Sequence, residues 1–520
     1  MNSKNPRQIA LKILNKFYQN EIFLEKILND FLINNELSNV DKSLTTELVY
    51  GVVRWQIKID FIISNFLKKD IQKLDKTILN ILRLSIYQLN YLDKIPDYAI
   101  VNEAVNLTKF NKLNSFTNFV NAILRNYLRK KEQIKFPLAE DFINYFSIIY
   151  SHPQWLVSRL ISQFGMEETE QILHSNNFRA KITIRVNETK SSISEVENFL
   201  IKNKIEFFKN EILPNCFVIN KSLSNLSNSD FFKQGKFTIQ DMSAALVSQL
   251  ALPKFTDLKS TNLIFDLCAA PGGKTCNLAE LIKLLNNRMN DNLQINNNWK
   301  IIANDLYSNK IDLIKNNVKR LGLNDIEHSN IEYSCVNALD FSYSEKADIV
   351  LLDAPCSGLG TISKKPDIKY LRKESDFAQL IELQRKLLVK SASLVKNGGI
   401  LVYSTCTIDK EENVKNIEWF LQNNNEFSLE PADNYVNKMF CDNGFLKCFS
   451  HKNYFNSNFE EDKFHNFHNK NRFHNIDFHN SITNFHNDII NFHNDISNFH
   501  NIDEHNIDGA FAVRLVKNNI

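Results

Sequence analysis

Hydrophobic residues recur at helical spacing through the first 145 residues of the chain. The clearest examples are Ile78, Leu82, Ile86 and Leu89 in one segment and Phe116, Val120, Ile123 and Tyr127 in another. Residues three and four positions apart share one face of a helix, so each set predicts a buried helical face. Glycine, which is frequent in turn-rich β domains, occurs here only at position 51. The pattern predicts an all-α bundle with its own core over residues 1–145.

The pattern changes twice after the predicted bundle. Residues 146–255 combine a helical period with a strand-like stretch at Lys181–Val186, which predicts a small α/β connector. Residues 256–450 then alternate between strands, loops and helices. The predicted strands are Leu263–Leu267, Ile301–Ala303, Asp348–Leu352 and Ile400–Tyr403. Such alternation is typical of a mostly parallel sheet covered by helices on both faces.

Residues 451–508 show neither the helical nor the strand-like period. The triplet Phe-His-Asn recurs here seven times in an asparagine-rich background. Histidine-rich tracts can bind metal, but this composition has too little apolar content to offset the entropy of ordering, so we expect a disordered insertion and no metal site. A strand-like stretch resumes at residues 509–520, which predicts that the insertion lies within a hairpin of the preceding domain.

Composition agrees with a multidomain protein of the cytoplasm. The chain has 520 residues and a formal net charge of +3, so any surface that binds nucleic acid has to be a local patch. The first residues lack the apolar core of a signal peptide, and the sequence has no apolar run of about 18 residues, so we expect neither secretion nor membrane association. The eight cysteines are dispersed, unlike those of a secreted disulfide scaffold.

A basic cluster ends the predicted bundle. It consists of Arg125, Arg129, Lys130, Lys131 and Lys135. Cations are favourable at the C-terminal end of a helix, and they also bind nucleic-acid phosphates. Both interpretations remain open at this point.

Two cysteines follow neighbouring predicted strands. Cys356 lies in the segment Asp353–Gly358 (DAPCSG), and Cys406 follows the strand that ends at Tyr403. Parallel sheets place their chemistry just beyond the carboxyl ends of their strands. Two thiols brought together there, with Asp353 beside them, favour covalent catalysis over simple packing.

A glycine-containing loop follows the first strand of the α/β region. Its residues are Cys268, Ala269, Ala270, Pro271, Gly272, Gly273 and Lys274. A strand, a tight loop and a helix N-terminus form a site for a polar or anionic ligand. The segment ending in Gly273 and Lys274 resembles a phosphate-binding Walker loop, but that pattern requires glycine at position 268, which is a cysteine.

Polar residues at the next two strand ends extend this candidate site. Asp305 can accept both ribose hydroxyls of a nucleoside cofactor, as acidic residues do in Rossmann folds. It lies further from the glycines than usual, and we attribute the difference to a loop insertion at Asn286–Asn298. Asn337 or Asp340 can read an adenine edge, although each can also be an ordinary turn residue.

These motifs resemble those of the RNA cytosine-carbon-5 methyltransferases of the Nop2/Sun group. The glycine loop resembles the family's S-adenosylmethionine loop, and the segments around Cys356 and Cys406 resemble its two cysteine motifs. Segments at Tyr50–Arg54, Tyr87–Leu89 and Asn121–Arg125 resemble the NusB-like RNA-binding domain of one subfamily. The resemblance covers nearly all of the chain outside residues 451–508. It implies a NusB-like domain followed by a Rossmann-like class I methyltransferase.

The resemblance implies a reaction and a role for each residue. Methyl would pass from S-adenosylmethionine to carbon-5 of a cytosine in 16S rRNA, by resemblance cytosine 967, through a covalent adduct. It implies that Cys406 is the nucleophile, that Asp353 contacts the ring and cofactor, and that Cys356 assists proton removal and release. The family usually has an acidic residue at the position of Asn337, so either Asn337 or Asp340 reads the adenine.

Other functions remain to be weighed against this expectation. DNA cytosine methyltransferases attack with a Pro-Cys thiol, which would point to Cys356 instead. A non-catalytic RNA-binding or ribosome-assembly protein would need neither thiol, and an amino-group methyltransferase would carry an Asp-Pro-Pro-Tyr-type loop. A different RNA cytosine could also be the target. The expected partner is 16S rRNA or a small-subunit assembly intermediate, bound by a monomer.

Overall fold

The computed structural model describes residues 5–20, 22–137, 140–210, 212–219, 226–252, 263–293, 299–324, 329–452 and 507–519. The predicted Phe-His-Asn insertion lies almost entirely outside these residues. The helices are α1 (Pro6–Asn20), α2 (Leu24–Asn34), α3 (Asn39–Arg54), α4 (Gln56–Ser64), α5 (Lys76–Tyr91), α6 (Asp97–Phe110), α7 (Thr117–Lys130), α8 (Phe142–Ile149), α9 (Gln154–Ser175), α10 (Ile193–Lys202), α12 (Asp230–Lys233), α13 (Met242–Leu250), α14 (Gly273–Leu293), α15 (Ser308–Leu321), α16 (Ile368–Leu371), α17 (Asp376–Leu394) and α18 (Val414–Asn423). Short 3₁₀ helices are η1 (Ile71–Lys73), η2 (Asn114–Phe116), η3 (Lys131–Gln133), η5 (Leu359–Thr361), η6 (Ala432–Asn434) and η7 (Lys438–Phe440).

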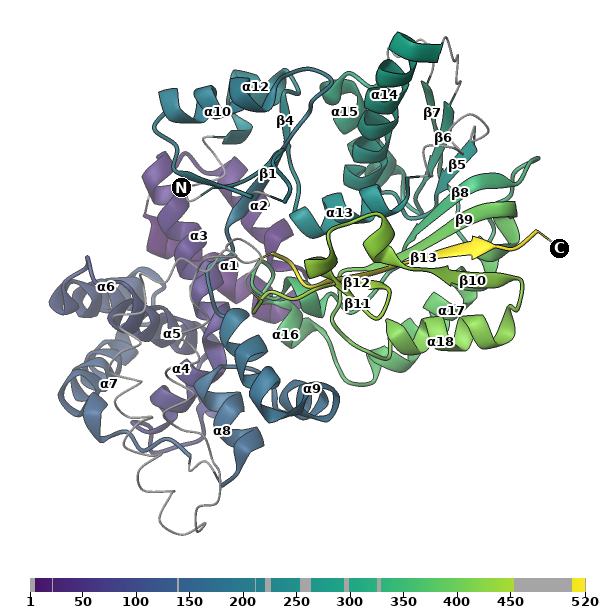
Figure 1. Ribbon diagram of the computed structural model, residues 1–520. Coiled ribbons are helices and arrows are strands. Elements are labelled where there is room, and N and C mark those ends of the chain that lie inside the picture. The colour runs from purple at the N-terminus through teal and green to yellow at the C-terminus, as the bar shows by residue number, and fades with distance from the viewer. Residues whose placement is uncertain are drawn as a thin grey trace, which may run out of the picture. The chain divides into compact units, whose positions relative to one another are not determined.

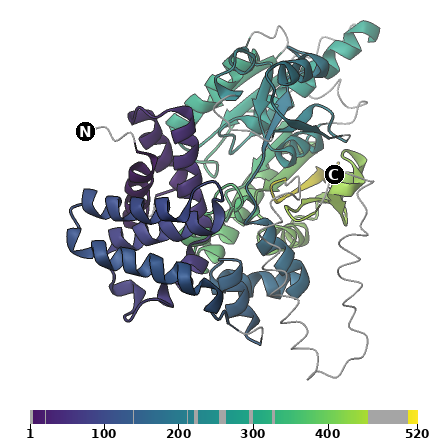
Figure 2. The same cartoon turned by 90° about the vertical axis from the view of Figure 1, so that its left-hand side faces the viewer.

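Helices α1 to α7 form the N-terminal bundle, drawn in purple and blue in Figure 2. Their apolar faces build one continuous core, which includes Leu82 and Tyr127. The start of α5 is fixed by Asp75, whose side chain accepts hydrogen bonds from the backbone amides of Thr77 and Ile78. The all-α prediction for this part of the chain is confirmed.

A small antiparallel sheet follows the bundle. Its strands are β1 (Ile182–Val186), β2 (Phe207–Lys209), β3 (Cys216–Ile219) and β4 (Phe237–Ile239). They are ordered β2-β3-β1-β4, and apolar residues of α10 such as Val196 pack on them. The predicted strand at Lys181–Val186 is therefore the central β1 of this sheet.

The large sheet positions the predicted site residues. Its strands are β5 (Leu263–Asp266), β6 (Trp299–Asn304), β7 (Ser329–Ser334), β8 (Ala347–Asp353), β9 (Val395–Thr405), β10 (Phe427–Glu430), β11 (Cys441–Asp442), β12 (Phe445–Cys448) and β13 (Ala510–Lys517). Strands β9-β8-β5-β6-β7 are parallel neighbours. Helices α17 and α18 lie on one face of the sheet and α13, α14 and α15 on the other (Figure 1).

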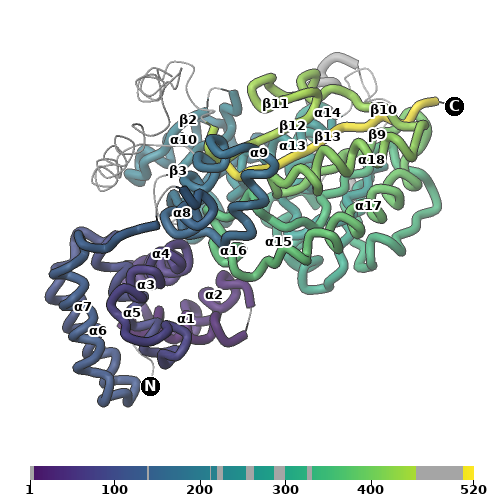
Figure 3. The backbone as a smooth tube through the Cα atoms, turned by 90° about the horizontal axis from the view of Figure 1, so that it is seen from below, coloured from purple at the N-terminus to yellow at the C-terminus, as the bar shows by residue number. Residues whose placement is uncertain are grey.

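Strand β13 joins this sheet after the insertion. It runs antiparallel between β9 and β12, and it appears in yellow beside them in Figure 3. Because β12 and β13 pair directly, the insertion connects two strands of a hairpin, as the sequence predicts. The mostly parallel Rossmann-like sheet is confirmed.

One local prediction is wrong. The sequence predicted a loop insertion at Asn286–Asn298, whereas helix α14 continues to Leu293. The stretch contains neither proline nor glycine, and asparagine is only mildly unfavourable inside a helix. The remaining residues, 294–298, lie outside the described part of the chain.

Candidate active site

Two cysteines meet at the carboxyl edge of the parallel sheet. Strands β8 and β9 are paired so that Asp353 lies opposite Ser404. The segments that follow these strands carry Cys356 and Cys406, and the two Sγ atoms lie 3.3 Å apart. The sequence predicted that these thiols lie together, and the strand register explains why they meet.

Hydrogen bonds hold the loop that carries Cys356. The backbone amide of Ser357 donates to Glu412 at 2.9 Å, and Gln384 donates to the same carboxylate at 2.8 Å. The guanidinium of Arg372 donates to the carbonyl oxygens of Cys356 and Ser357, both at 3.0 Å. The loop therefore has several fixed attachment points.

The surroundings distinguish the two thiols. A hydrogen bond from Cys356 lowers the pKa of Cys406, and the Lys274 cation acts in the same direction against burial and the Asp353 carboxylate. The hydrogen bond to Cys406 raises the pKa of Cys356 well above its usual value, with burial and Glu412 adding to the effect. Because the thiolate is the nucleophilic form, Cys406 is the more readily activated sulfur.

An ion pair lies beside the thiols. Nζ of Lys274 donates to Oδ2 of Asp353 at 2.6 Å, and the hydroxyl of Ser404 donates to Oδ1 at 2.8 Å. Burial alone would lower the pKa of Lys274, but the attraction of Asp353 outweighs it and raises that pKa. Lys274 therefore keeps a positive charge beside Cys406.

The glycine loop connects β5 to α14. Gly272 has φ +97°, a conformation that L side chains rarely adopt, and its amide donates to the carbonyl of Ala269 at 2.7 Å. Cys268, Ala270, Gly273 and Lys274 are half-buried, whereas Pro271 is exposed. Burial raises the pKa of the Cys268 thiol, so this cysteine is not an activated nucleophile.

Asp305 lies at the carboxyl end of β6, against the glycine loop. Its Oδ2 accepts a hydrogen bond from the amide of Ala270 at 3.2 Å. Helix α15 begins at Ser308 with Tyr307 at its N-cap position, so Asp305 lies before the cap of this helix. The carboxylate instead faces the same loop as the predicted cofactor residues.

Asp266 was not singled out from the sequence. It ends β5, is fully buried, and accepts a hydrogen bond from the Thr275 hydroxyl at 2.6 Å. Burial raises its pKa to about 7, although the Thr275 hydrogen bond opposes this shift. Its Oδ1 has no hydrogen-bond partner in the described part of the protein. The sequence signal that could have identified Asp266 is an aspartate at the end of an apolar, strand-like stretch.

The two candidates for adenine recognition lie in one exposed turn after β7. Oδ1 of Asn337 accepts from the amide of Leu339 at 3.1 Å, and the amide of Asp340 donates to the carbonyl of Asn337 at 2.8 Å. Both side chains are exposed. Asn337 therefore uses its side-chain oxygen to shape the turn.

The acceptor groups and the tight loop of this site fit a nucleoside sulfonium compound. The Asp305 carboxylate suits a pair of ribose hydroxyls, and the unpartnered Oδ1 of buried Asp266 is an acceptor at the start of the same loop. The loop packs closely at Gly272, where an added Cβ would lie 3.2 Å from Ile314. We find no group of three or more His, Cys, Asp or Glu side chains placed to hold a metal ion within the described ranges.

The basic cluster lies at the end of α7 and in the turn that follows. Arg125, Arg129, Lys130, Lys131 and Lys135 are all exposed. Arg125 and Arg129 each donate to a nearby asparagine, Asn121 and Asn126 respectively, on their own helix. No described helix combines the length and apolar character needed to cross a bilayer.

Family comparisons match three separate segments of the chain. The 16S rRNA methyltransferase RsmB/F family matches residues 254–465, and the NusB family matches residues 4–129. An RsmF/B-like ferredoxin-like domain matches residues 152–225, the region predicted only as a small α/β connector.

Individual relatives span most of the chain. The probable ribosomal RNA small subunit methyltransferase B of Bacillus subtilis is 36% identical, and the match covers 82% of this chain and 90% of that protein. The corresponding protein of Synechocystis sp. is 35% identical, over 82% of this chain and 91% of its own.

Solved structures share the fold. PH0851 matches with a TM-score of 0.68, 25% identity and 99% coverage of both chains. NSun6 from Pyrococcus horikoshii, solved with the S-adenosylmethionine analogue SFG, matches with a TM-score of 0.50 and 19% identity over 71% of this chain and 99% of its own. With S-adenosylmethionine as its cofactor, the chain belongs to the family of the ribosomal RNA small subunit methyltransferases B.

Proposed function

We propose that this protein methylates carbon-5 of a cytosine in 16S rRNA through a covalent Cys406 adduct. The single observation that carries the proposal is the 3.3 Å separation of the Cys356 and Cys406 sulfurs beside the Lys274–Asp353 ion pair. By family resemblance the target is cytosine 967, in free rRNA or an assembly intermediate, and the enzyme acts as a monomer.

Cys406 begins the reaction as a thiolate. Its sulfur bonds to carbon-6 of the cytosine, and the electrons of the 5,6 double bond move toward carbon-5. The hydrogen bond from Cys356 and the charge of Lys274 both favour the thiolate. The target base has to leave its stack so that sulfur and methyl donor can approach it.

Asp353 contacts the ring of the bound cytosine and stabilises its developing charge. Lys274 and Ser404 hold the Asp353 carboxylate in place with hydrogen bonds of 2.6 and 2.8 Å. The bound cofactor supplies an electrophilic methyl group on a sulfonium. Asp305 and the backbone of Gly272 and Gly273 hold it, and Asn337 or Asp340 reads its adenine.

Cys356 ends the reaction. Its high pKa keeps it protonated before attack. Once carbon-5 carries the methyl group, Cys356 assists transfer of the carbon-5 proton to solvent, the C–H electrons re-form the 5,6 double bond, and the Cys406 sulfur leaves carbon-6 as a thiolate. The product, 5-methylcytosine, is released.

Replacing each thiol separately tests this assignment. Cys406→Ala abolishes both methylation and adduct formation, because no sulfur bonds to carbon-6. Cys356→Ala leaves a protein–RNA adduct that survives a denaturing gel, because release fails. Radiolabelled methyl transfer and nucleoside analysis of the RNA product measure the outcome. An adduct in Cys406→Ala, or loss of both methylation and adduct in Cys356→Ala, would reverse the roles.

A further inference from the structure

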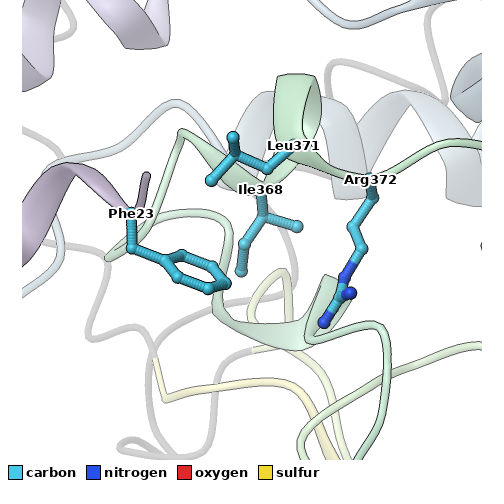
Figure 4. Close-up of a pocket in the computed structure, with 4 residues that line it drawn as sticks. All are labelled: Phe23, Ile368, Leu371 and Arg372. Atoms are coloured by element: carbon cyan, nitrogen blue, oxygen red, sulfur yellow. The ribbon is translucent and has the colours of Figure 1, made fainter. Parts of the chain in front are cut away.

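A pocket of about 180 Å³ lies next to the loop that carries Cys356. Phe23, Ile368, Leu371 and Arg372 line it, and Figure 4 shows their side chains around a common space. Phe23 comes from the N-terminal bundle, just before α2, and the other three come from α16 and the residue that follows it. The catalytic scheme above uses none of these side chains.

The lining suits a flat aromatic ligand. The Phe23 ring is 51% exposed, and the buried side chain of Ile368 forms an apolar floor. Arg372 uses Nε and Nη2 for the Cys356 loop, and its Nη1 has no protein acceptor among the described residues. Unstacked RNA bases stack on aromatic rings and on the planes of arginine guanidinium groups. The volume lies below the roughly 300–1,000 Å³ of sites for whole ligands, so it suits a single ring system.

Charge around the pocket favours a polyanion. Within the segment Lys364–Lys373, Lys364 pairs with two aspartates and Lys369 is buried, which leaves Lys365 and Lys373 as its exposed lysines. Lys365 forms a loose 3.5 Å ion pair with the exposed Glu25. Exposed cations of this kind attract the phosphates of a nucleic-acid strand.

The pocket is held at a fixed position beside the chemistry. The amide of Leu24 donates to Oδ2 of Asp367 at 2.9 Å, which attaches the backbone next to Phe23 to the catalytic domain. On the other side, Arg372 donates to the carbonyl of Cys356 at 3.0 Å. One residue therefore connects the pocket to the loop of a reactive thiol.

We propose that this pocket holds a nucleobase of the RNA strand next to the target cytosine, stacked on Phe23 and bordered by Arg372. The inference rests on the proposed function, since it names how the same site binds its RNA. The base in the pocket positions the strand so that the target cytosine enters between Cys406 and the methyl donor.

Fluorescence of a base analogue tests the proposal on the full-length protein. A small-subunit rRNA fragment containing the target cytosine carries 2-aminopurine at one flanking position at a time. Wild-type protein is expected to quench the fluorescence at one flanking position by stacking. Phe23→Ala abolishes this quenching, Phe23→Trp restores it, and Phe23→Ala weakens binding of the fragment by about 5- to 150-fold.

Phe110→Ala is the matched control, because Phe110 is 53% exposed in the same bundle and does not line the pocket. It is expected to leave quenching and affinity unchanged. Equal quenching by wild type and Phe23→Ala at every position, with equal affinity, overturns the inference and leaves a protein partner as the pocket's occupant. Failure of the wild type to methylate the RNA instead overturns the proposed function.

Discussion

At the scale of single residues, Asp353 has two opposing effects on the site. Its negative charge raises the pKa of Cys406, whereas the hydrogen bond from Cys356 and the Lys274 cation lower it. In the proposed reaction, its carboxylate also stabilises the ring during methyl transfer. Reactivity of the thiol and catalysis should therefore respond in opposite directions when this charge is removed.

Asp353→Asn is expected to increase alkylation of Cys406 by iodoacetamide at neutral pH, because a lower pKa gives a larger thiolate fraction. Methylation should fall by about 10²- to 10³-fold, as on removal of a charge-stabilising group. Mass spectrometry of the Cys406 peptide and methyl transfer measure the two effects. Glu382→Gln, at an exposed carboxylate on α17, should change neither. Slower alkylation in Asp353→Asn would contradict this electrostatic account.

The sequence was sufficient to select Cys356, Cys406 and the glycine loop, because each directly follows an apolar strand. It was not sufficient to rank the two thiols from the residues alone. Their difference comes first from the hydrogen bond between them, and then from Lys274, far away in the sequence, and Glu412 beside the Cys356 loop. Asp266 escaped notice for a similar reason, since only the folded sheet shows that its Oδ1 is buried without a partner among the described residues.

At the scale of elements, two glycines join β13 to the catalytic loops. The amide of Gly509 donates to the carbonyl of Gly360 at 2.8 Å, and the amide of Gly360 donates to the carbonyl of Cys406 at 3.1 Å. A Cβ added at Gly360 would lie 1.8 Å from the oxygen of Gly509. This close approach of two backbone segments requires glycine at both positions, 360 and 509.

Gly360→Ala is expected to destabilise the protein by about 1–3 kcal/mol, the usual range for overpacking, and to lower methylation per folded molecule. Thermal unfolding and methyl transfer measure the two effects. Gly444→Ala is the control, because its φ of +79° strains an alanine while the nearest atom is 3.3 Å away. Gly444→Ala should lose stability but keep its methylation activity per folded molecule. Full methylation by Gly360→Ala would show that this contact does not position Cys406.

Hydrophobic runs were sufficient to predict β5, β6, β8 and β9, because buried parallel strands are continuously apolar. The short strands β10, β11 and β12 were not predicted. They are two to four residues long, and their pairing with β13 or with one another depends on a strand far along the chain. Helix α14 is longer than the sequence predicted, because asparagine weakens a helix without ending it.

At the scale of the whole molecule, buried basic side chains join the bundle to the catalytic domain. Nζ of Lys369 donates to the carbonyls of Arg54 and Ser151, both at 2.8 Å, and Arg54 donates to the carbonyl of Ser363 at 2.9 Å. Burial lowers the pKa of Lys369 well below its usual value. Periodicity predicted each domain separately, but no local pattern could show these contacts between distant segments.

Reversing charge in the basic cluster tests its part in RNA binding. The combined change Arg125→Glu, Arg129→Glu and Lys130→Glu should weaken binding to many RNAs alike, because phosphates are common to all sequences. The slope of log affinity against log salt should become shallower by about 0.7–0.9 for each phosphate that the variant no longer neutralises. Filter binding across salt concentrations measures both. Lys386→Glu with Lys415→Glu, on exposed sites of α17 and α18, should have no effect, and an unchanged slope in the cluster variant removes it from the RNA surface.

The position of β13 also has an expected consequence for a newly made copy of the protein. Residues 510–517 occupy the interior of the sheet between β9 and β12, yet they are translated after everything else in the site. A chain still emerging from the ribosome lacks the strand that supports the nucleophile's loop. We therefore expect a copy to act on RNA only after synthesis has passed this strand.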